Sequence, residues 1–91
     1  MKSKSTILTP KQVLDMYYLD ARLHILEIAA MLDRGDRGKA AYGENVDEDL
    51  RAKILSRALE ILASPSEEPN RVERLLNLFS TLDTRHPQEG E

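Results

Sequence analysis

Hydrophobic residues between Thr9 and Arg34 recur at alternating steps of three and four positions. That spacing places residues along one side of an α-helix. No glycine interrupts the stretch, and its one proline lies at the second position, where a helix tolerates it. The pattern therefore predicts one long helix over residues 9–34, roughly 37 Å in length.

Both ends of this helix carry residues typical of helix termini. Thr9 is a suitable N-cap, Pro10 suits the first helical position, and Gln12 completes a capping box with Thr9. At the other end Gly35 is the expected stop, and Arg34 lies where a cation interacts favourably with the helix dipole.

The apolar residues of this helix form two stripes rather than one. The first stripe consists of Leu14, Tyr18, Ala21, Ile25, Ile28 and Leu32. The second stripe consists of Met16, Leu19, Leu23, Leu26 and Ala30. Each stripe has the spacing of a helix–helix seam, whereas a surface helix of a small monomer normally shows a single apolar face. Two stripes indicate burial on two sides of the helix.

Two shorter helices follow a glycine-containing connection over residues 35–44. The first is predicted over residues 46–63, with Asn45 and Glu48 as a capping pair and Ser64-Pro65 as its end. The second is predicted over residues 69–82, with Ser66 or Glu68 as its cap. Each shows one apolar stripe of helical period.

No stretch of the sequence shows the alternation of a β-strand, so we expect an all-α fold. Short connections favour antiparallel neighbours, which gives a small up-down three-helix bundle with one long N-terminal helix. We expect a flexible arm over residues 1–8, a single helical domain over residues 9–83 and a disordered tail over residues 84–91. In this arrangement the first stripe forms the core. It packs against the apolar residues Ile54, Leu55, Ala58, Leu62, Leu75, Leu76 and Phe79.

Composition excludes several functional classes. The net charge is −3, and the lysines and arginines are scattered, so we expect neither nucleic acid nor an anionic membrane as a partner. The absence of cysteine excludes disulfides, thiolate nucleophiles and Cys-ligated zinc. No apolar run of signal-peptide type follows the polar residues 1–6. Charged residues interrupt the long helix, so we do not expect it to span a membrane. We therefore expect a cytoplasmic protein.

One polar cluster has residue types that carry chemistry. Asp20, His24 and Glu27 lie at i, i+4 and i+7 and so share one side of the long helix. Carboxylates and an imidazole at this spacing could hold a divalent metal, or form an acid/base histidine oriented by a carboxylate. The shorter helices offer no matching histidine, so ordinary surface pairs are the simpler interpretation. We expect no metal, no cofactor and no enzymatic activity.

The functional expectation rests on the second stripe. Two shorter helices with one stripe each can cover the first stripe but leave the second in water, as a larger apolar patch than most monomers expose. A second copy of the chain, related by a two-fold axis, is the simplest cover. We therefore expect a small interaction or scaffold module that is a homodimer, or that docks a helical protein partner, through the second stripe. The alternative is a metal-binding or acid/base site on Asp20, His24 and Glu27.

Overall fold

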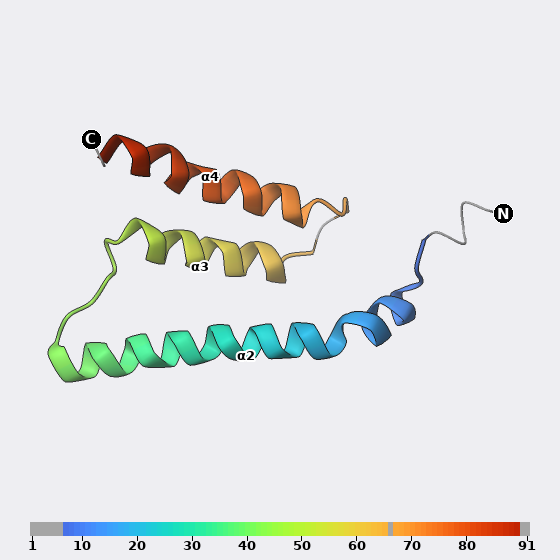
Figure 1. Ribbon diagram of the computed structural model, residues 1–91, viewed down its shortest axis with the longest axis horizontal. Coiled ribbons are helices and arrows are strands. Elements are labelled where there is room, and N and C mark those ends of the chain that lie inside the picture. Colours follow the sequence, from blue (N-terminus) through green and yellow to red (C-terminus); the bar gives the residue numbers. More distant parts are fainter. Residues whose placement is uncertain (1–6, 66, 90–91) are drawn as a thin grey trace. The chain divides into compact units, whose positions relative to one another are not determined.

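The described part of the chain consists of three helices, α2 (Pro10–Tyr42), α3 (Leu50–Ala63) and α4 (Arg71–Glu89), shown in Figure 1. This computed structural model describes residues 7–65 and 67–89, with side chains for 7–65 and 67–81. Within those ranges there is no strand, which confirms the all-α class. The predicted arm over residues 1–8 falls outside the described residues except for Ile7 and Leu8, both exposed.

The chain divides between Glu44 and Asn45 into two compact units. The first unit contains α2, and the second contains α3 and α4. The single domain expected over residues 9–83 and the up-down arrangement of three helices therefore stay predictions.

The start of α2 is the predicted one. Thr9 Oγ1 accepts a hydrogen bond of 3.1 Å from the Gln12 backbone N–H, and Gln12 Oε1 accepts one of 2.9 Å from the Thr9 N–H. Pro10 occupies the first turn. Because the capping box satisfies two backbone donors that the helix itself leaves unpaired, the sequence alone locates this end.

The end of α2 differs from the prediction, because the helix passes through Gly35 and continues to Tyr42. Its true stop is Gly43, which adopts a left-handed conformation (φ 71°, ψ 11°) and donates a hydrogen bond of 2.9 Å to the Lys39 carbonyl. A glycine inside a helix costs only about 1 kcal/mol relative to alanine, so neither Gly35 nor Gly38 ends the helix. The resulting helix has 33 residues and is about 50 Å long.

The start of α3 also lies later than predicted, at Leu50 rather than residue 46. Asn45 does not cap the helix, because its Oδ1 accepts the Asp47 N–H at 3.0 Å and closes a local turn. Asp49 is the N-cap, and its Oδ1 accepts the Arg51 N–H at 2.8 Å. Short polar side chains compete for such roles, and here the turn takes Asn45.

Helix α4 begins at Arg71. The preceding Asn70 carbonyl accepts the first helical hydrogen bond, from the Arg74 N–H at 3.0 Å. The predicted start at residue 69 is therefore two residues early. Of the two caps proposed for it, Ser66 lies outside the described residues. The helical backbone of α4 continues to Glu89, beyond the predicted end at residue 82, and the disordered tail over residues 84–91 stays a prediction.

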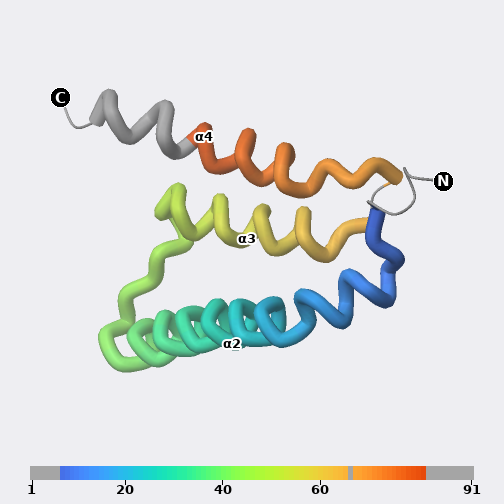
Figure 2. The backbone as a smooth tube through the Cα atoms, turned by 45° about the vertical axis from the view of Figure 1, so that its right-hand side comes forward, coloured from blue at the N-terminus to red at the C-terminus, as the bar shows by residue number. Residues whose placement is uncertain are grey.

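Helices α3 and α4 lie side by side and run in opposite directions, so they form a helical hairpin (Figures 1 and 2). Its buried residues are Ile54, Ala58 and Ile61 of α3. Leu75 and Leu78 of α4 are half-buried. Ile54 and Ala58 were expected in the core, whereas Ile61 and Leu78 were not.

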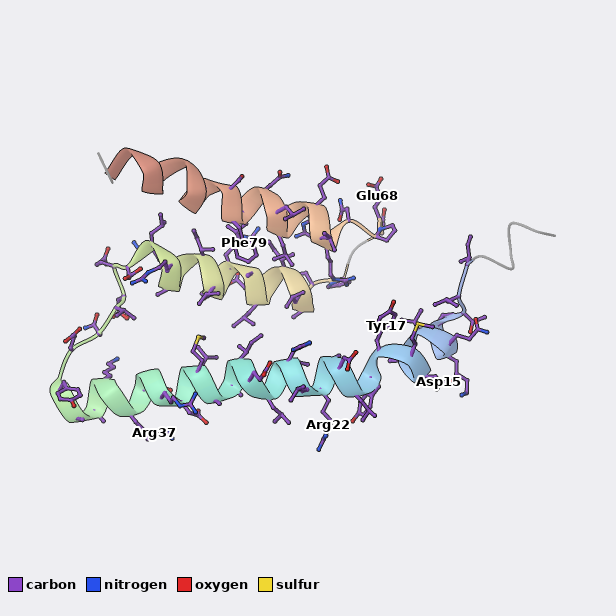
Figure 3. The ribbon with its side chains drawn as sticks, viewed as in Figure 1. Asp15, Tyr17, Arg22, Arg37, Glu68 and Phe79 are labelled. Atoms are coloured by element: carbon purple, nitrogen blue, oxygen red, sulfur yellow. The ribbon has the colours of Figure 1, made fainter. Side chains whose placement is uncertain are left out.

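Several residues predicted for the core are exposed on the hairpin. Leu55, Leu62 and Leu76 are 41%, 50% and 63% exposed. They lie about 100° around their helices from the buried seam. Because the helices are antiparallel, the same rotation in each brings these positions to one side of the hairpin. Phe79 lies at the border of this side, on the part of α4 that faces α3 (Figure 3), and is 39% exposed. We name this surface the hairpin apolar face. It comprises Leu55, Leu59, Leu62, Val72, Leu76 and Phe79.

Candidate functional site

The second stripe of α2 is a row of exposed apolar side chains. Its four large members, Met16, Leu19, Leu23 and Leu26, are all exposed, with Leu19 the most accessible at 72%. Ala30, at its C-terminal end, is half-buried. Side chains three and four positions apart on a helix lie one above another, so the five residues form one continuous surface.

The first stripe lies on nearly the opposite side of the same helix. At about 100° per residue, the centres of the two stripes are roughly 160° apart. No residue of α2 is buried, and the large members of the first stripe are exposed as well. One partner helix cannot cover both sides, so α2 offers two separate contact surfaces.

The polar residues Asp20, His24 and Glu27 lie on an edge between the two stripes. The structure brings two of them together, because His24 Nδ1 lies 3.1 Å from Glu27 Oε1. Both side chains are about two-thirds exposed, at 68% and 64%. Water therefore solvates the pair and screens its interaction, as at an ordinary helix surface.

Asp20 is not joined to that pair by any hydrogen bond or ion pair that the described residues show. Within residues 7–65 and 67–81, no group of three or more His, Cys, Asp or Glu side chains is arranged to hold a metal ion. Of the three residues that the metal or acid/base alternative requires, the structure thus brings only His24 and Glu27 together, as an exposed pair.

Hydrogen bonds shift the protonation of the Asp49 carboxylate. Hydrogen bonds from the Arg51 side chain, and then from its backbone N–H, lower the pKa of Asp49 to about 2. The side-chain contacts are Nε to Oδ1 at 3.1 Å and Nη2 to Oδ2 at 2.8 Å. Its position as the N-cap of α3 accounts for these hydrogen bonds.

A hollow of about 400 Å³ lies against α3. It is lined by Asp47, Ala52, Lys53, Ser56, Arg57 and Glu60. Its cations are already paired, because Lys53 Nζ lies 3.1 Å from Glu48 Oε1 and Arg57 Nη1 lies 3.0 Å from Glu60 Oε1. Both cations that line the hollow therefore already have a carboxylate partner, and neither is available to bind an anion.

Comparison with known proteins finds no family model, no curated protein and no solved structure that matches the chain. Among the helices of the described ranges, none has both the length and the apolar character required to cross a membrane. The candidate functional surface is accordingly defined by the geometry of α2 alone. Sequence reasoning identified both stripes of α2. It assigned Leu55, Leu62, Leu76 and Phe79 to the core, and did not predict that they form an exposed face of the hairpin.

Proposed function

We propose that this protein is a small helical interaction module that forms a homodimer through the second stripe of α2. The observation that carries the proposal is a helix of 33 residues with apolar residues on two opposite sides and none of them buried. A contiguous apolar patch of this kind on a small protein is typical of an interaction surface.

Two other apolar surfaces are exposed, the first stripe of α2 and the hairpin apolar face. Both are apolar and exposed, and both are built from residues spaced at three and four positions. We propose that they cover each other, which gives the up-down three-helix bundle. In that bundle the second stripe is the remaining apolar surface of α2, and a second copy of the chain covers it.

The energies are compatible with a dimer of moderate affinity. Burying one large aliphatic side chain contributes about 1.5–3 kcal/mol, and the second stripe supplies four such side chains from each chain. Association costs an estimated 4–15 kcal/mol in lost freedom of the two molecules. A surplus remains but is not wide, so we expect dissociation to be measurable in the micromolar range.

The substitution Leu23→Glu tests this function. It places a carboxylate at the middle of the second stripe, and in a two-fold contact it places two such charges close together. We expect sedimentation to show a monomer where the unaltered protein is dimeric. His24→Glu is the matched control, because it introduces the same side chain one residue away, on the polar edge between the stripes, and should leave the dimer intact.

Circular dichroism of both variants separates loss of the dimer from loss of the fold. Helical Leu23→Glu monomers beside helical His24→Glu dimers are the expected result. An unaltered protein that sediments as a monomer would contradict homodimerisation, and so would a Leu23→Glu protein that remains dimeric.

A further inference from the structure

The pattern of the second stripe also specifies how two copies would pair. Resting on the proposed homodimer, we infer that the two α2 helices associate in parallel and in register, so that each residue of the second stripe meets its own equivalent. The stripe has an odd number of layers, separated by steps of three, four, three and four residues. That asymmetry between its two ends distinguishes the orientations.

In a parallel, in-register pair all five residues of the stripe face apolar partners, because each layer is formed by two copies of one residue. The stripe alternates between residues followed by a step of three and residues followed by a step of four. In an antiparallel pair a residue of one kind faces a residue of the other kind, so one of the five residues is left without an apolar partner. One antiparallel register places Met16 opposite Asp33, and the other places Ala30 opposite Gln12. Either register buries a polar side chain against an apolar one, which costs free energy.

The charged residues flanking the stripe favour the same orientation. In the parallel pair Arg22 of one copy flanks Glu27 of the other, five residues further along, which is the spacing of interhelical ion pairs. At about 100° per residue, Arg22 lies on one edge of the stripe and Glu27 on the other. Each pair of this type occurs twice, because a two-fold axis relates the copies.

One repulsive contact accompanies this arrangement, between Asp15 of one copy and Asp20 of the other. Asp15 is already paired within its own chain, because Lys11 Nζ lies 3.1 Å from its Oδ2. The antiparallel registers have repulsive contacts too: one brings Asp20 to Glu27, and the other brings Arg22 and Asp20 each to its own equivalent. These contain no opposing attraction comparable to the pair of Arg22 with Glu27.

Disulfide trapping tests the orientation directly, because the chain contains no cysteine of its own. Ala30→Cys places the thiol at the last layer of the stripe, where a parallel pair holds the two α-carbons within the 4.4–6.8 Å that a disulfide spans (about 6 Å). We expect oxidation to convert most of this variant into a covalent dimer. Ala29→Cys, one residue away on the edge, is the control and should cross-link much more slowly.

The outcomes separate the orientation from the dimer itself. A dimer in which Ala30→Cys does not cross-link overturns the parallel pairing and leaves the proposed function standing, and preferential cross-linking of mixed Leu19→Cys and Ala30→Cys chains would identify one antiparallel register. A monomer of the unaltered protein overturns both proposals.

A charge exchange provides an independent measurement on the same protein. Arg22→Glu and Glu27→Arg should each raise the dimer dissociation constant severalfold, and the double variant should return it toward the original value. Failure of the double variant to recover would contradict the pairing of Arg22 with Glu27.

Discussion

The Arg71 guanidinium joins the start of α4 to the end of α3, because its Nη2 donates a hydrogen bond of 2.8 Å to the Ser64 carbonyl. Ser64 caps the C-terminus of α3, and Arg71 is the first residue of α4. A cation at the C-terminus of a helix interacts favourably with the helix dipole and satisfies a carbonyl that the helix leaves unpaired.

Arg71→Met should therefore destabilise the folded protein by about 1.5–3 kcal/mol, the range for a hydrogen bond that involves a charged group. Arg57→Met is the control, because Arg57 forms only an exposed pair with Glu60 on the surface of α3 and should change stability by less than about 0.5 kcal/mol. Chemical denaturation followed by circular dichroism measures both. Equal effects of the two substitutions would show that the contact with Ser64 does not hold the hairpin together.

The low pKa of Asp49 predicts a pH dependence at the start of α3. Its pKa in the folded chain is about 2, below the ordinary value of 3.8, so the ionised carboxylate stabilises the fold above pH 3.8. That contribution is lost as the pH falls from about 4 through about 2. Asp49→Asn keeps a side chain that can cap the helix but does not titrate. Its unfolding free energy should fall less steeply than that of the unaltered protein over this window, and parallel curves would contradict the assignment.

The two glycines near the end of α2 should respond in opposite ways to alanine. Gly38 lies inside the helix, and an added Cβ would meet no atom within 4 Å, so Gly38→Ala should stabilise the helix by about 0.5–1 kcal/mol. Gly43 has a φ of 71°, which favours glycine, so Gly43→Ala should destabilise by about 1 kcal/mol. Thermal melts that move in the same direction would show that α2 does not end at Gly43.

The sequence predicted those features of the fold that neighbouring residues determine. The capping box of Thr9 and Gln12 is local, and the structure has it as expected. The stop of α2 at Gly43 was not predicted, because Gly35, Gly38 and Gly43 compete for this role and the residues between them decide how far the helix continues. Asn45 and Asp49 competed in the same way for the N-cap of α3.

Packing between helices was harder to predict than the helices themselves. Leu78 was not among the residues predicted for the core but lies half-buried, whereas Leu76 was predicted there and is exposed. The periodicity of a helix defines a broad apolar side, but only the rotation of its neighbour decides which part of that side is covered. For the candidate site, sequence spacing placed Asp20, His24 and Glu27 on one edge, whereas side-chain geometry joins only His24 to Glu27.

The His24–Glu27 pair leads to a prediction about metal ions. An exposed pair is a weak ligand set, so zinc or ferrous iron at stoichiometric concentration should leave the melting temperature unchanged. A ligand that binds the native state must raise that temperature. A rise that depends on metal concentration and is abolished by His24→Ala would favour the metal-binding alternative instead.

Sedimentation equilibrium of the unaltered protein tests the dimer most directly. Samples from below one micromolar to several hundred micromolar should fit a reversible equilibrium between a chain of 10.3 kDa and a species of twice that mass. The dimer should predominate at the upper end, because the exposed second stripe of α2 is then covered by a second copy. A single species of 10.3 kDa across the whole range would contradict the account.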